Sequence, residues 1–112
     1  MERRRAKRFN VVNLELFQNG SNEHIGKVIN ISKGGILVTS NHEFAPGENH
    51  SFYIPFTQTI NGEVKFKFNG DIIWCKPDPM SSSTFSIGME FSDIPEIQTV
   101  FIQQMVKIYG EK

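Results

Sequence analysis

The sequence has 112 residues, 38% of them hydrophobic, and equal numbers of acidic and basic side chains. This length corresponds to one ordinary domain with a single core. No run approaches the ~20 apolar residues of a transmembrane helix, and no apolar segment follows the charged N-terminus, so we expect neither a membrane span nor a secretory signal. The single cysteine, Cys75, excludes an intramolecular disulfide and favours a cytoplasmic location.

The charge is distributed unevenly along the chain. The first eight residues contain five Arg or Lys and one acid, which leaves seven basic and eleven acidic residues in 9–112. Proteins that follow a nucleic-acid backbone usually spread Lys and Arg over a whole face. We therefore predict a flexible basic arm over residues 1–8 attached to a single domain over 9–112, with a small, compact anion as its partner rather than a long polyanion.

Alternating apolar and polar residues, separated by turn residues at short intervals, predict an antiparallel all-β domain built as a sheet, sandwich or barrel. We expect strands at about residues 9–18, 23–31, 35–40, 50–58, 63–76 and 84–92. Asn61 and Gly62 predict a tight hairpin between two of these strands. Asn69 and Gly70 suggest a bulge or bend within a long strand. Three serines at 81–83, just after two prolines, predict a mobile loop.

The end of the chain changes to a helical period, with apolar residues recurring at spacings of three and four. This stripe comprises Ile94, Ile97, Val100, Phe101, Ile102, Met105, Val106 and Ile108. We predict an amphipathic helix at about 94–109, with Asp93 as its N-cap and Gly110 as its stop. We expect the helix to pack across one end of the β-domain. The alternative is that part of its apolar face docks a partner.

Two short stretches carry chemistry suited to binding a ligand. In the arm, Arg4 and Arg8 present planar forks of donors that match phosphate oxygens or the O6/N7 edge of guanine, and the same plane stacks on a base. Between two predicted strands, Asn30 offers an amide and Ser32 a hydroxyl, and two glycines follow. The alternatives are a solvated basic tail and an ordinary turn. A ligand that carries both phosphate and guanine would use every one of these groups.

Arg4-x-x-x-Arg8 followed by Asn30-x-Ser32-x-x-Gly35 resembles the two-part signature of PilZ domains, which bind the bacterial second messenger cyclic di-GMP (c-di-GMP). Residues 70–74 and 88–91 also look like the late PilZ strands. The resemblance implies a six-stranded antiparallel β-barrel, the PilZ-like split barrel, with a C-terminal α-helix.

The resemblance also implies roles for individual residues. Arg4 and Arg8 would contact phosphates and guanine, Asn30 a guanine edge, and Ser32 a phosphate or nearby polar atom, while Gly35 would keep the turn open. Further candidate contacts are Arg3, Arg5, Gly34 and Trp74. In the family, the residue before the arm motif influences whether one ligand or a stacked pair binds, and Arg3 at this position favours a stacked pair.

By resemblance, the protein is expected to be a single-domain receptor or adaptor, in which c-di-GMP clamps the arm onto the barrel turn and alters a surface seen by an unidentified downstream protein. Motility, adhesion and polysaccharide export are all usual for the family. One alternative is a PilZ-like interaction module without ligand binding. Another is a small barrel that binds single-stranded nucleic acid on exposed aromatic side chains. Those aromatic residues would be Phe52, Tyr53, Phe66 and Phe68.

We expect no enzyme, because no constellation of catalytic groups is recognisable in the sequence. No cofactor or metal is expected either. The residues His24, His42, His50 and Cys75 match no zinc-binding spacing.

Overall fold

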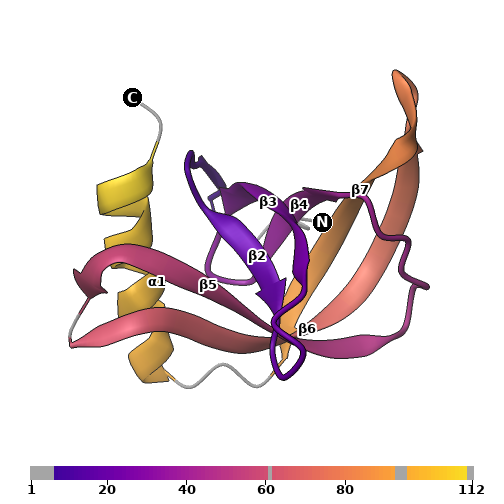
Figure 1. Cartoon of the computed structure of the whole chain (residues 1–112). Helices are drawn as coiled ribbons and strands as arrows, with labels where there is room; N and C mark the ends of the chain where they lie inside the picture. The colour runs from indigo at the N-terminus through magenta and orange to yellow at the C-terminus, as the bar shows by residue number, and fades with distance from the viewer. Residues whose placement is uncertain (1–6, 61, 93–95, 111–112) are drawn as a thin grey trace, which may run out of the picture.

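The computed structural model describes residues 7–60, 62–92 and 96–110 (Figure 1). Within these residues, seven strands precede one helix. The elements are β1 (Phe9–Asn10), β2 (Glu15–Gln18), β3 (His24–Ile31), β4 (Gly35–Ser40), β5 (Asn49–Ile60), β6 (Glu63–Asp78), β7 (Ser81–Ser92) and α1 (Glu96–Tyr109).

Six of the strands close into an antiparallel barrel. The pairing runs β3–β2–β5–β6–β7–β4 and returns from β4 to β3, so each of these strands has two neighbours. The short strand β1 lies outside this ring and pairs only with β3. Closure leaves no long unpaired edge among these strands. The predicted six-stranded antiparallel barrel with a C-terminal helix is therefore confirmed.

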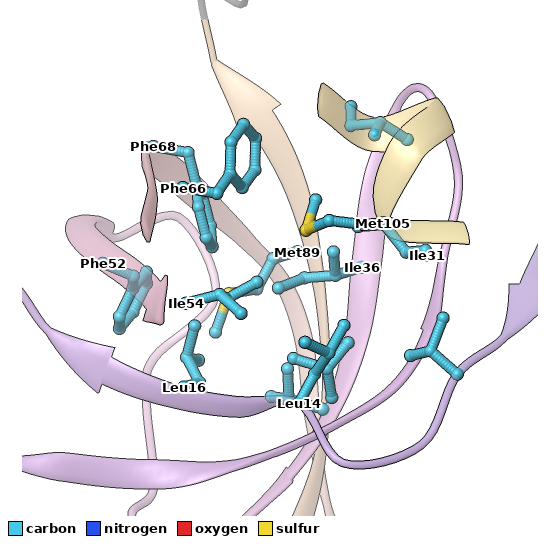
Figure 2. Packing of buried hydrophobic residues seen from close by; sticks show 14 of the residues in the cluster. Leu14, Leu16, Ile31, Ile36, Phe52, Ile54, Phe66, Phe68, Met89 and Met105 are labelled. Carbon is cyan, nitrogen blue, oxygen red and sulfur yellow. The ribbon is translucent and has the colours of Figure 1, made fainter. Parts of the chain in front are cut away.

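The barrel interior is filled by aliphatic and aromatic side chains (Figure 2). Phe52, Phe66 and Phe68 are only 0%, 2% and 5% exposed, and their rings pack against one another. Each such buried side chain stabilises the fold by about 1.5–3 kcal/mol. Because these rings face the core, they cannot form the outer stacking surface that the nucleic-acid alternative requires.

The predicted strand at 9–18 is wrong in one respect, because the structure divides it into β1 and β2. Asn13 has a positive φ of 65°, which extended strands do not tolerate. The chain nevertheless stays along one edge of β3, since the Leu14 carbonyl accepts a hydrogen bond from the Val28 N–H at 2.9 Å. The interruption turns Leu14 into the core, where it is 1% exposed.

The mobile loop predicted at 81–83 is also wrong, because β7 begins at Ser81. Asp78 pairs directly with Ser81, and the Met80 N–H donates to the Asp78 carboxylate at 2.8 Å. The β6–β7 hairpin therefore turns tightly and projects away from the rest of the barrel, on the side of the molecule opposite α1 (Figure 1). The predicted hairpin between β5 and β6 is confirmed by the pairing of Ile60 with Glu63, although Asn61 itself lies outside the described residues. The bulge expected at residues 69–70 lies instead between Ile72 and Trp74.

Helix α1 packs on the barrel core, as expected, but through a face rotated from the predicted one. Ile102, Met105 and Tyr109 are buried, whereas Val100 and Ile108 are 40% and 37% exposed. Met105 points toward the barrel residues Ile31 and Ile36 in Figure 2. The predicted N-cap and the first two predicted helical positions lie outside the described residues.

Candidate functional site

The basic arm meets the end of β3, just before the turn that follows it, through a direct hydrogen bond. Arg8 precedes β1, and β1 runs antiparallel to β3 with Asn10 opposite Asn30. Nη1 of Arg8 donates to Oδ1 of Asn30 at 3.0 Å. The structure therefore brings together one residue from each half of the predicted motif. Arg4 and the neighbouring arginines at 3 and 5 lie outside the described residues.

The hydroxyl of Ser32 shapes the turn. Ser32 is 6% exposed, and its Oγ accepts hydrogen bonds from the N–H groups of Gly34 and Gly35 at 3.2 and 3.3 Å. The same hydroxyl donates to the Gly35 carbonyl at 3.4 Å, and the Ser32 N–H donates to that carbonyl at 2.9 Å. These bonds hold the turn in one conformation without help from a ligand.

The two glycines of the turn have different surroundings. A Cβ on Gly34 would meet no heavy atom within 4 Å, whereas a Cβ on Gly35 would lie 2.1 Å from the carbonyl oxygen of Met89. The Gly34 carbonyl accepts a hydrogen bond from the Phe91 N–H at 2.9 Å, which fixes the turn onto β7. Gly35 thus allows β4 to begin close against β7, and Gly34 leaves open space above the turn.

A row of residues crosses the outer surface of the barrel from Asn30. Asn30 pairs with Leu37 on β4, which pairs with Gly88 on β7. Gly88 in turn pairs with Trp74 on β6. Directly opposed residues of a sheet share a face, so these four residues form what we call the outer row. Because neighbouring strands lie ~4.8 Å apart, its ends are separated by ~14 Å.

The far end of the outer row carries an exposed indole. Trp74 lies over Gly88, where a Cβ would come within 2.5 Å of Nε1 and 2.6 Å of Cε2. The side chain is 36% exposed, and Lys76 Nζ lies 5.4 Å from its ring centroid. An exposed indole beside an ammonium group can stack on a base whose phosphate the lysine attracts. Sequence reasoning named Trp74 but missed Leu37 and Gly88 as its neighbours in this site.

A cavity of about 400 Å³ opens between the arm, the turn and α1. Apolar and polar residues line it together: Lys7, Phe9, Ser32, Lys33, Ile102, Gln103 and Val106. Two lysines beside an apolar wall favour an anionic group carried on a flat or apolar body. The cavity therefore places the end of the arm and the helix on either side of a hollow next to the turn.

The cations near the turn are not neutralised by carboxylates of the described chain. All three ion pairs among the described residues join a His to a Glu, and none involves Arg or Lys. Lys7, Arg8 and Lys33 are exposed and keep their charge available to an anion.

Groups of three or more His, Cys, Asp or Glu that could hold a metal do not occur among residues 7–60, 62–92 and 96–110. In the same part of the chain, no helix has the length and apolar character needed to cross a membrane. The expected absence of a metal or cofactor stays a prediction.

The fold is that of a small closed β-barrel domain with six strands in the ring, in which the basic arm is hydrogen-bonded to the outer face of β3. The PilZ domain family model matches residues 2–107. The chain therefore belongs to the PilZ domain family. No curated protein matches the chain significantly.

Solved structures share this fold at low sequence identity. The Bacillus subtilis inhibitor of motility MotI/DgrA aligns with a TM-score of 0.72 and 21% identity, covering 96% of this chain and 51% of that one. The PilZ domain of Escherichia coli YcgR with c-di-GMP gives 0.65 and 16%, covering 96% and 89%. The MrkH–c-di-GMP complex of K. pneumonia gives 0.65 and 13%, covering 96% and 51%. The chain thus spans about half the length of MotI/DgrA and MrkH.

Proposed function

We propose that the protein is a receptor for c-di-GMP and that the ligand joins the basic arm to the barrel turn. The observation that carries this proposal is the hydrogen bond between Arg8 and Asn30, because it joins one residue from each half of the signature. Membership of the PilZ family supports it, and two similar solved structures, YcgR and MrkH, hold c-di-GMP.

In this proposal the guanidinium groups of Arg4 and Arg8 bind phosphate oxygens and the O6/N7 edge of guanine. Asn30 accepts a hydrogen bond from Arg8 through Oδ1, and its Nδ2 is a donor suited to the acceptor atoms of a base. Ser32 and Gly35 hold the turn that presents Asn30, and the open space above Gly34 leaves room for a phosphate.

At the far end of the outer row, Trp74 offers a platform for a second base. In this proposal Arg3 and Arg5 add positive charge or stacking surface to the arm. Arg3 favours a stacked pair of ligands, and the stoichiometry of binding decides between one ligand and two.

The segment that follows the arm and β1 contacts the helix. Immediately after β1, the Val12 N–H donates to the Tyr109 carbonyl at 2.9 Å, and Val11 forms a bridge with Gly110. A ligand that fixes Arg8 therefore acts on the segment that is bonded to the end of α1. We propose that this coupling changes the surface that the protein presents to a downstream protein. In this proposal the protein acts as a receptor rather than an enzyme. It does so in the cytoplasm, where the messenger is made.

Calorimetric titration tests this function. We expect c-di-GMP to bind the wild-type protein with micromolar affinity, on the order of −8 kcal/mol, and GTP and a short single-stranded oligonucleotide to bind weakly or not at all. The Arg4→Ala/Arg8→Ala variant should lose binding. The matched control, Lys65→Ala/Lys67→Ala, also removes two positive charges, but from β6 and away from the turn. This control variant should keep the affinity for c-di-GMP.

If c-di-GMP produced no heat with a folded wild-type sample, the receptor function would be contradicted. The alternative of a PilZ-like interaction module without ligand binding would then remain. Heat from the oligonucleotide alone would favour the nucleic-acid alternative.

A further inference from the structure

One acidic side chain stands beside the anion-binding turn. Glu90 is the partner of Gly35 across β4 and β7, and it lies two residues beyond Gly88 on β7. Met89 between them is 2% exposed and points into the core, so Gly88 and Glu90 both face outward. Glu90 is exposed and lies about 7 Å along the strand from the glycine that Trp74 covers.

The Glu90 carboxylate has free acceptor capacity. Within the part of the chain that the structure describes, it takes part in no side-chain hydrogen bond and no ion pair. Its neighbour across β6 and β7, Asp71, differs, because Asp71 accepts a hydrogen bond from Asn49 Nδ2 at 2.7 Å. Among the described residues, Glu90 is thus an available carboxylate next to the turn.

A carboxylate beside a site for a phosphate ligand is electrostatically unfavourable unless it binds donors of that ligand. Guanine has such donors in its N1–H and N2–H₂ groups, whereas adenine has no amino group at C2. Asn30 presents a single acceptor atom, Oδ1, which already accepts a hydrogen bond from Arg8, whereas N1–H and N2–H₂ of guanine present two donors side by side. A carboxylate on the same outer face has two acceptor oxygens and matches this pair of donors.

We infer that Glu90 is a specificity-determining residue, which accepts hydrogen bonds from N1–H and N2–H₂ of a guanine that rests near Trp74. This inference rests on the proposed function and deepens it. It makes the site selective for guanine over adenine, and for guanine over hypoxanthine, which keeps N1–H but lacks the 2-amino group.

Titration of wild-type protein and Glu90→Gln with c-di-GMP, cyclic di-IMP and cyclic di-AMP tests the inference. Gln keeps the size of the side chain but presents a neutral carbonyl and an amide donor to the base. We expect Glu90→Gln to bind c-di-GMP about ten- to a hundredfold more weakly, the loss typical of a charged hydrogen bond. The wild-type preference for c-di-GMP over cyclic di-IMP should shrink in the variant.

The direction of the change in c-di-GMP affinity distinguishes hydrogen bonding to guanine from a purely electrostatic effect of the Glu90 charge. If Glu90 acted only through its charge, its removal would tighten the binding of an anionic ligand, so unchanged or tighter c-di-GMP binding by Glu90→Gln overturns the inference. Asp71→Asn removes the same charge one strand away and should not weaken binding; equal weakening in both variants would also overturn it. Failure of the wild-type protein to bind c-di-GMP would instead refute the proposed function, and Glu90 would lose its role with it.

Discussion

The adjacent glycines of the turn provide a matched pair of substitutions with opposite expected effects. In Gly35→Ala, the new Cβ would lie 2.1 Å from the Met89 carbonyl oxygen, whereas ordinary contacts begin at 3.4 Å. The two atoms would have to separate by more than 1 Å, and both belong to the paired strands β4 and β7. Overpacking of this kind costs about 1–3 kcal/mol of the free energy of unfolding.

In Gly34→Ala, the new Cβ would enter open space, and Gly34 has no positive φ that would penalise a side chain. This variant should be neutral or more stable by about 0.4–1 kcal/mol, because Ala restricts the unfolded chain more than Gly does. The two variants have the same composition and differ only in which glycine is replaced.

Thermal unfolding followed by circular dichroism measures the difference. At about 4–8 °C per kcal/mol for a domain near this size, Gly35→Ala should lower Tm by about 5–20 °C, while Gly34→Ala should leave it within a few degrees of the wild type. Equal Tm values for the two variants would refute the argument that Gly35 is needed for the close approach of β4 to β7. A large loss in Gly34→Ala alone would show that the open side of the turn has been misassigned.

Three further results are expected from other parts of the barrel. Tyr109→Phe removes the hydroxyl that lies 2.7 Å from both the N–H and Oγ1 of Thr57, and urea unfolding should show a loss of about 1–3 kcal/mol. The hydrogen bond from His50 holds the pKa of Glu48 below its ordinary value. The stabilisation that Glu48 gives the fold is therefore present above the unfolded-state pKa of Glu48, and it is lost as the pH falls through the folded-state pKa. An NMR titration of His50→Gln should show the Glu48 pKa moving upward, and no movement would contradict this cause. Trp74 is the only tryptophan, so its fluorescence should change on saturation with c-di-GMP, and unchanged emission would exclude it from the site.

The barrel was predictable because apolar and polar residues alternate through most of its strands. The strand expected at 63–76 is observed as Glu63–Asp78, and the one expected at 35–40 as Gly35–Ser40. The alternation failed where the backbone, not the residue type, decides the outcome. A positive φ at Asn13 divides the first predicted strand, and pairing with β6 draws residues 81–83 into β7 despite their preference for turns.

The helix face was misassigned because its apolar stripe is broad. Sequence reasoning counted Ile108 and left out Tyr109, whose hydroxyl makes it appear suited to the surface. The structure buries Tyr109 to 6% exposure because Thr57 supplies a partner for that hydroxyl, and Ile108 is left 37% exposed. Thr57, a hydrogen-bond partner on a distant strand, makes Tyr109 rather than Ile108 the buried residue. The spacing of apolar residues along the helix cannot reveal such a partner.

Some residues of the candidate site can be recognised from local sequence, whereas the position of others depends on the register between strands. Arg8 and Asn30 could each be named from the sequence as candidate ligand contacts, because both belong to compact motifs with recognisable chemistry. The position of Trp74 in line with Asn30 depends instead on two bulges, one between Val28 and Asn30 and one between Ile72 and Trp74. Without the second bulge, the residue opposite Gly88 would be Ile73, and Trp74 would pair one position earlier along β7.

Deleting Ile73 is therefore a direct test of the register that builds the outer row. The deletion shortens the bulged segment by one residue, while Trp74 follows Ile72 directly and keeps a regular place opposite Gly88. The barrel should stay folded and the tryptophan emission should stay close to that of the wild type. A strongly red-shifted emission from a folded deletion variant would mean that the bulge itself, rather than the pairing with Gly88, holds the indole on this face.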